Sequence, residues 1–336
     1  MQIDAVGDVF ANPLQIEAAA AEAEADGYDG MAIPETRHDV FVSLGLAARA
    51  TTRIALQSGI AVAFARNPMT TAVLANDLQL VTGGRFRLGL GSQVRSHIER
   101  RYGMPWSKPA ARMEEYVSAI RAIWARFATG EPLRFEGEFY RHTLMTEFFD
   151  PGPNPHGNPP ILLAAVGERM AEVAGRVADG MLCHSLTTRR YLREVTIPAL
   201  RRGRGRTLDG FTVSLSALAV LGDDESQRAR AADGVRRQIA FYASTPAYRP
   251  VLDLHGWGEV HERLNELSRQ NAWDEMARLI DDDMLDAFAV AGDAAQVADA
   301  LRERYGELVQ RVSIYTPYPV DPGAARAVAD AFTAAA

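Results

Sequence analysis

A repeated alternation of short apolar runs with longer amphipathic runs is the feature of this sequence that most limits its fold. Eight apolar runs have the pattern of β-strands, and a helical pattern follows each of them. The eight runs begin near Ile3, Met31, Ile54, Phe86, Ile161, Met181, Phe211 and Gln310. Such repeats give parallel strands joined by right-handed crossovers, and eight of them close into a (β/α)8 TIM barrel. We therefore predict an α/β fold in which residues 1–336 form a single barrel domain.

An open doubly wound sheet is the alternative to the barrel. That fold usually carries a glycine-rich phosphate loop with G-x-G-x-x-G spacing after its first strand. Residues 7–11 read Gly-Asp-Val-Phe-Ala and lack this spacing. The barrel is therefore the favoured fold.

The chain is longer than a plain barrel, which needs about 250 residues. Two stretches account for the excess. Residues 130–159, after the fourth strand, are rich in proline, glycine and asparagine, and residues 223–286, after the seventh, are largely helical in pattern. We expect both to be insertions that take part in substrate choice, because binding residues concentrate in long loops of this kind.

Composition excludes several classes of partner. The 36 basic and 43 acidic residues give a net charge of −7, which offers no basic field for a nucleic acid. The arginine-rich run at 201–206 is interpreted as a solvated helix end. The single cysteine, Cys183, excludes an intrachain disulfide, and no segment has the apolar length of a membrane span. We predict a cytoplasmic protein that acts on a small molecule, with no nucleic-acid or membrane partner.

Ionisable residues gather after the second predicted strand, in the loop 34–39. In a TIM barrel the loops after the carboxyl ends of the strands carry the active site. Glu35 and His38 in this loop are candidates for a general acid and base, and the unperturbed pKa of histidine lies nearest neutrality. The alternative is a surface loop of solvated charges.

Glycines with short polar neighbours end three further strands. A glycine there allows an unusual backbone or the close approach of a flat ligand, although a β-bulge or a plain turn explains it equally well. The third of these segments turns into a helix, whose first amides suit an anionic group. The candidate cofactor-binding residues are Ser58, Gly59 and Ile60, then Gly91 and Ser92, then Ala165, Val166, Gly167, Glu168, Arg169 and Met170.

Other chemistries find no support in the sequence. No spacing of histidine and acidic residues builds a metal site, and the Asp281-Asp282-Asp283 run lacks the interleaved glycine of a calcium loop. No serine lies in a G-x-S-x-G elbow, so a hydrolase triad has no anchor. The residues alone indicate a barrel that binds a phosphate-bearing cofactor or substrate.

Four segments follow one another in a recognisable order: Pro34–Phe41, Ser58–Ile60 with Arg66–Pro68, Gly84–Ser92, and Val166–Met170 with Val177–Leu182. In this order they resemble the luciferase-like monooxygenase superfamily, in particular its branch that uses the deazaflavin coenzyme F420. The stretch 93–106 is also similar to that of F420-type members rather than bacterial luciferases.

The resemblance implies a (β/α)8 barrel with the deazaflavin or flavin ring lying across the strand ends. It implies that Glu35 and His38 border the ring, that Gly59 and Ile60 back it through a bulge, often with a non-prolyl cis peptide, and that Ser92 lies nearby. The segment Gly167–Met170 would hold the phosphate. The implied reaction is hydride transfer between the deazaflavin and a carbon of the substrate, and the implied assembly is a homodimer.

Two other functions stay open. The barrel motifs are shared with monooxygenases that use reduced FMN delivered by a separate reductase. The third possibility is a barrel that binds a ligand without a cofactor and has no catalytic activity.

Overall fold

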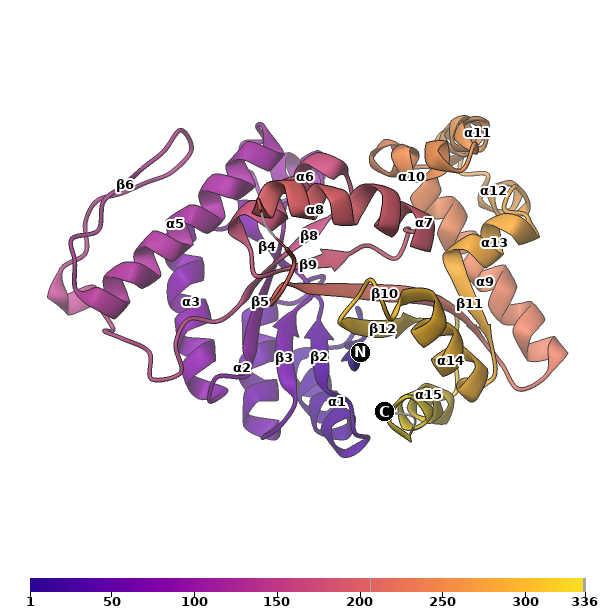
Figure 1. The fold of residues 1–336 in the computed structure, drawn as a ribbon, viewed down its shortest axis with the longest axis horizontal. Coiled ribbons are helices and arrows are strands. Elements are labelled where there is room, and N and C mark those ends of the chain that lie inside the picture. Colours follow the sequence, from indigo (N-terminus) through magenta and orange to yellow (C-terminus); the bar gives the residue numbers. More distant parts are fainter. Residues whose placement is uncertain (206, 335–336) are drawn as a thin grey trace.

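The computed structural model describes residues 1–205 and 207–334 and contains a closed barrel of eight parallel strands (Figure 1). Each barrel strand pairs with the next, and the eighth pairs with the first. The barrel strands in order are β1 (Gln2–Val6), β2 (Gly30–Ile33), β3 (Ala55–Ser58), β5 (Phe86–Gly91), β8 (Ile161–Ala165), β9 (Gly180–Cys183), β10 (Thr212–Leu221) and β12 (Arg311–Tyr315). These correspond to the eight predicted runs, so the predicted (β/α)8 TIM barrel is confirmed.

Helices fill the connections between successive strands. Those of the barrel ring are α1 (Pro13–Ala25), α2 (Val40–Ala50), α3 (Pro68–Val81), α4 (Arg95–Arg100), α5 (Pro109–Thr129), α6 (Glu168–Val177), α7 (Arg189–Tyr191), η3 (Leu192–Thr196), α8 (Ile197–Arg204), α14 (Ala294–Tyr305) and α15 (Pro322–Ala334). Arg206, in the arginine-rich run, lies outside the described residues.

Side chains that cap the helices explain where the early ones begin. Asn12 accepts hydrogen bonds from the first turn of α1, and Gln15 completes a reciprocal capping box. Asp39 caps α2 and Asn67 caps α3, so the loops after the first three barrel strands end on a polar cap. These three loops are therefore fixed at their far ends as well.

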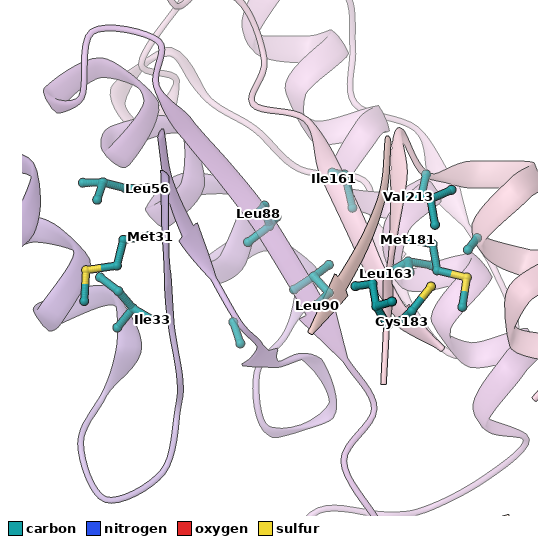
Figure 2. Close-up of a cluster of buried hydrophobic side chains, with 14 of the residues drawn as sticks. Met31, Ile33, Leu56, Leu88, Leu90, Ile161, Leu163, Met181, Cys183 and Val213 are labelled. Carbon is teal, nitrogen blue, oxygen red and sulfur yellow. The ribbon is translucent and has the colours of Figure 1, made fainter. Parts of the chain in front are cut away.

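The strand registers divide the barrel wall into an outer and an inner face. Residues that point outward, such as Leu56, Leu88, Leu163 and Met181, are buried beneath the helices (Figure 2). The inward residues follow the opposite parity. A Cβ on Gly89 would approach Leu182 across the interior, which is consistent with both facing inward. The hydrophobic core is thus the layer between the strands and the helices. The inside of the barrel is separate from it.

A buried ion pair closes the amino-terminal end of that interior. Arg311 on β12 pairs with Asp4 on β1, and both side chains are almost fully shielded from solvent. Gly30 on β2 leaves the space for this pair, since a Cβ there would lie 2.6 Å from the Asp4 carboxylate. With this end sealed by a paired charge, the open end of the barrel is at the carboxyl ends of the strands.

The first insertion contains a short hairpin that projects from one end of the molecule (Figure 1). Its strands are β6 (Phe135–Glu136) and β7 (Arg141–His142), and a short turn, η2 (Glu147–Phe149), follows. The Glu115 carboxylate on α5 accepts three backbone N–H groups of the hairpin loop, at 2.6–2.9 Å. The hairpin is thus fixed to α5.

The second insertion is helical, as predicted, and gathers at the opposite end of the molecule (Figure 1). It comprises α9 (Glu225–Ala243), η4 (Pro246–Tyr248), α10 (Arg249–Leu254), α11 (Gly258–Arg269), α12 (Trp273–Arg278) and α13 (Asp282–Phe288). It packs on the far end of β10 in a second apolar cluster, which includes Val235, Leu264 and Phe288 of the insertion and Leu218 of β10. Asp281 caps α13, which gives the acidic run 281–283 a structural role.

Four short strands were absent from the sequence prediction: β4 (Ala61–Val62), which pairs with β5, the hairpin strands β6 and β7, and β11. β11 (Ala289–Gly292) pairs with the last four residues of β10, beyond the stretch of β10 that pairs with β9. Leu218 pairs with Tyr315 of β12 and with Ala289 of β11, so β11 lies on the β9 edge of β10. The ten-residue β10 thereby serves both the barrel and the insertion. Among the described helices, none is long and apolar enough to cross a membrane.

Candidate active site at the mouth of the barrel

Small inward-facing residues line one half of the mouth, on β2, β3, β5 and β8. Ala32 and Ala164 are inward by register and only partly buried, and Gly59 just after β3 is exposed. A Cβ on Gly59 would meet that of Ala32 at 3.1 Å. We call this set of residues, with Gly91, the small-residue half of the mouth. It offers backbone and methyl groups, a surface on which a flat ligand can lie closely.

The Gly59–Ile60 peptide bond is cis, as the resemblance implied. The Ile60 side chain covers Gly91 on β5, where an added Cβ would lie 2.8 Å from Ile60 Cδ1. Ser58 is fully buried, and its hydroxyl donates to the carbonyl of Gly89 at 2.8 Å and accepts from its N–H at 2.9 Å. Gly59, Ile60 and Gly91 therefore lie together, while Ser58 holds β3 to β5.

The Glu35 carboxylate is fully engaged by its neighbours. Arg66 donates to both of its oxygens, at 2.7 and 2.8 Å, and the Val62 N–H donates at 2.8 Å. Arg66 also donates to Asp39, the cap of α2. Burial alone would lower the pKa of Arg66, but hydrogen bonds and charge from Glu35 and Asp39 outweigh it and raise that pKa. This network ties the loop after β2 to the chain just beyond Ile60.

His38 lies in the same loop but is exposed, and it makes no hydrogen bond within the described residues. The loop around it is held elsewhere: Thr36 donates to the Val9 carbonyl, and Arg101 donates to the carbonyl of Thr36 at 2.6 Å. Of the two candidate acid–base residues, Glu35 is thus fixed in an ion pair, whereas the His38 ring is exposed.

The third predicted segment ends β8 and opens α6. Ala165 is buried and Val166 is half-buried, and Gly167 caps the helix with open space where a Cβ would lie. No side chain in the described part of the chain caps the first amides of α6, those of Glu168, Arg169 and Met170. Glu168 places a negative charge beside these amides, and Arg202 on α8 forms an ion pair with it. Ser92, after β5, is half-buried and its hydroxyl donates to its neighbour's carbonyl.

Aromatic side chains line the other half of the mouth, and sequence reasoning missed them as a group. His184, just after β9, packs against Tyr242 of α9 at 4.5 Å between ring centroids and against Tyr248 of η4 at 4.6 Å. Tyr315, inward at the end of β12, interacts with Tyr242. We call these four residues the aromatic half. The sequence signal was the parity of His184, two residues beyond the inward-facing Leu182.

Burial sets the protonation of the aromatic half. It lowers the pKa of His184 to about 4 and raises that of Tyr248 to about 12. The pKa of Tyr242 is raised by burial and further by Tyr315 and Tyr248. At neutral pH these groups are uncharged. Cys183, the preceding residue, faces outward into the core, and burial raises its thiol pKa to about 12.

One cleft of the molecule lies away from the predicted site residues. It has a volume of about 420 Å³ and is lined by Arg189, Arg304 and His255 among others. Arg304 already donates to two backbone carbonyls, and His255 Nε2 lies 2.8 Å from the Thr188 hydroxyl. Nowhere in residues 1–205 and 207–334 do three metal-ligating side chains cluster.

Comparison with known proteins places this geometry in context. The profile of the luciferase-like monooxygenase family matches residues 6–311. An uncharacterized protein of Mycobacterium tuberculosis is 50% identical over 297 residues, covering 88% of this chain and 87% of that protein. The 5,10-methylenetetrahydromethanopterin reductase of Archaeoglobus fulgidus is 28% identical over 291 residues, covering 84% and 83% of the two chains.

Solved structures share the fold at lower identity. The coenzyme F420-dependent tetrahydromethanopterin reductase of Methanopyrus kandleri has a TM-score of 0.80 at 22% identity, covering 99% of both chains. The oxygenating constituent of 3,6-diketocamphane monooxygenase from Pseudomonas putida, in complex with FMN, has a TM-score of 0.66 at 16% identity, covering 99% of this chain and 98% of that one.

Proposed function

This chain belongs to the luciferase-like monooxygenase family, and we propose that it is an F420-dependent oxidoreductase that transfers a hydride between the deazaflavin and a small organic substrate. The observation that carries the proposal is the small-residue half of the mouth, where the exposed Gly59 lies against Ala32 and Ile60 packs on Gly91. The relatives named for F420 support deazaflavin over flavin.

The residues present fit such a cofactor. When bound, the deazaflavin supplies a ring carbon that carries the hydride. Gly59 and Ile60 would back the ring, with Ser92 beside them. The amides of Glu168, Arg169 and Met170, with the exposed Arg169 guanidinium, would hold the phosphate, because helix N-termini attract anions. Arg202 would offset the charge of Glu168 there.

The geometry suggests different roles for the two candidate acid–base residues. Three donors hold the Glu35 carboxylate, so we propose that it positions the chain from Ile60 to Val62 rather than carrying a proton. His38 is exposed in the same loop and is the better candidate to carry one. Replacing His38 with Gln would then lower kcat and leave F420 binding unchanged.

An FMN-dependent monooxygenase is the second candidate, supported by the shared fold with the FMN-bound oxygenating constituent. In that case a separate reductase would deliver the reduced flavin. A barrel without catalytic activity is the third. In each case a cytoplasmic homodimer is part of the proposal, and light scattering measures the assembly.

Titration of the purified protein with F420 and FMN tests the proposal. We expect micromolar binding of F420, read from its fluorescence, and weaker binding of FMN. Tight binding of FMN alone, with oxygen consumption on addition of reduced FMN, would replace the proposal by the monooxygenase. Arg169→Ala is expected to weaken F420 binding. If the wild type binds no F420 and Arg169→Ala leaves the affinity for its ligand unchanged, a cofactor-free binding barrel is favoured.

A further inference from the structure

His184 is held in one orientation by contacts from three segments. The N–H of Leu186 donates to His184 Nδ1 at 3.0 Å. The edge of the ring meets Tyr242 at 80° between planes, and Tyr248 lies over it at 37°. Two aromatic contacts and one hydrogen bond leave the imidazole little freedom to rotate or flip.

These contacts fix the tautomer of the ring. Nδ1 accepts a hydrogen bond, so it carries no hydrogen, and the hydrogen of the neutral ring is on Nε2. Burial disfavours the charged form, which keeps the ring neutral near pH 7. His184 is therefore a hydrogen-bond donor at Nε2 and cannot act there as an acceptor.

The Nε2–H group has no acceptor among the described residues. It is also absent from the side-chain polar atoms that are fully shielded from solvent and without a partner, so it is not completely enclosed. His184 directly follows β9 and continues the inward-facing parity of Gly180 and Leu182, at the carboxyl end of that strand. A fixed donor thus lies at the mouth, beside two tyrosine rings.

We propose that His184 determines specificity by donating its Nε2–H to an oxygen of the substrate, and that the substrate is a carbonyl compound or the corresponding alcohol. The substrate's apolar part would pack against Tyr242 and Tyr248. This inference rests on the proposed function, because the donor gains importance when charge develops on that oxygen. A neutral imidazole that donates without losing its proton is suited to polarising a carbonyl.

The chemistry balances with the cofactor proposed above. Reduction adds a hydride, supplied by reduced F420, to the carbonyl carbon and breaks the C=O π bond. The electron pair moves to the oxygen, which takes a proton from water or from His38. His184 stabilises the developing charge throughout and is itself unchanged.

Two variants distinguish the effect of the Nε2–H donor from that of the aromatic ring. His184→Phe keeps an aromatic ring between the tyrosines and removes the donor, and His184→Gln restores an N–H near the Nε2 position. The probes are acetophenone and ethylbenzene, which differ at the carbonyl and need no cofactor to bind. We expect the wild type to bind acetophenone about tenfold more tightly than ethylbenzene, the Phe variant to lose this preference, and the Gln variant to regain most of it.

Nitrogen-15 NMR of the wild type gives an independent readout, with the His184 signals assigned by their loss in the variants. We expect the Nε2–H tautomer at pH 7 and a shift of that signal with acetophenone but not with ethylbenzene. An Nδ1–H tautomer, a charged ring, or a wild type that does not distinguish the probes would overturn the proposal. So would an unchanged preference in a folded Phe variant.

The F420 titration is run on the same samples. If the wild type distinguishes the probes but binds no F420, the proposed function fails and the donor role of His184 stands. If F420 binds with equal affinity to wild type and variants while the probes are not distinguished, the donor role fails alone. Should His184→Phe not fold, the NMR result on the wild type decides.

Discussion

The two halves of the barrel mouth are built from different parts of the chain and offer different chemistry. The small-residue half comes from the barrel strands β2, β3, β5 and β8 and presents glycine and alanine. The aromatic half draws on the ends of β9 and β12 and on α9 and η4 of the second insertion. The first half belongs to the scaffold, and the second depends on a segment added to it. We infer that the scaffold half serves the cofactor and that the insertion serves the substrate.

Breaking the Glu35–Arg66 pair is expected to have the largest effect, because it frees the small-residue half from its anchor. Arg66→Met leaves the Glu35 carboxylate, whose side chain is 7% exposed, without its main partner. Removing one member of a buried pair costs about 3 kcal/mol of unfolding free energy. Chemical denaturation measures this loss, and F420 affinity should fall with it.

Arg95→Met is the matched control. Arg95 pairs with Glu99 within α4, but its side chain is 70% exposed. Exposed pairs of this kind contribute little to stability, so a much smaller loss is expected. Equal losses in the two variants would mean that the Glu35–Arg66 network anchors nothing.

Gly91→Ala changes a residue of the small-residue half itself. The added Cβ would lie 2.8 Å from Ile60 Cδ1, so the Ile60 side chain has to move. Overpacking of this kind costs about 1 to 3 kcal/mol. We expect F420 affinity to fall about tenfold, a change of about 1.4 kcal/mol, while the preference for acetophenone over ethylbenzene persists.

Gly45→Ala controls for the loss of a glycine. It lies in α2 with open space around its Cβ position, and alanine there should stabilise the helix by about 0.5 to 1 kcal/mol. If Gly91→Ala binds F420 as the wild type does, the cofactor does not depend on this half.

The sequence predicted the small-residue half better than the aromatic half, for physical reasons. Apolar runs report strands directly, and glycines at strand ends stand out, so Gly59 and Gly91 were found. Tyr242 and Tyr248 reach His184 only because the insertion folds back over the barrel, a contact that no local pattern encodes. The partner of Glu35 was invisible for the same reason, since Arg66 lies beyond the next strand.

Secondary structure shows the same limit. Each barrel strand was predicted because it is buried beneath helices on its outer face. β11 was missed because it is a four-residue Ala-Val-Ala-Gly stretch whose only strand partner among the described residues is the far end of β10. Its identity as a strand depends on the unusual length of β10 rather than on its own composition.

The aromatic half should make the unfolding free energy depend on pH, through the protonation of His184. Its pKa is about 4 in the folded state and near 6.5 when exposed in the unfolded state. Above pH 6.5 neither state binds the proton, and between pH 6.5 and 4 only the unfolded state does. Stability therefore falls as pH drops through this window, by at most about 1.4 kcal/mol per pH unit.

His184→Phe removes this contribution, so its unfolding free energy should fall less steeply than that of the wild type between pH 6.5 and 5. Tyr242 and Tyr248 pack against the ring and stay neutral there, so no charge on these neighbours reverses the sign. His38→Gln, which replaces an exposed ring, is the control. If the unfolding free energy of the wild type and of His184→Phe changed equally with pH, the fold would not lower the pKa of His184.

The smallest expected effect lies at the edge of the small-residue half, where Glu168 opens α6. Arg202→Ala leaves the Glu168 carboxylate beside the amides that would hold the phosphate. The pair is exposed, so the expected cost is about 0.5 kcal/mol, a two- to threefold loss of F420 affinity. Glu168→Gln should raise the affinity by a similar factor, and in that background Arg202→Ala should have little further effect.

The differences in F420 affinity should all shrink in high salt, because screening weakens the interactions of exposed charges. If Arg202→Ala changes F420 affinity equally with and without Glu168, then Arg202 acts on the cofactor itself, and the anionic end lies nearer α8 than α6.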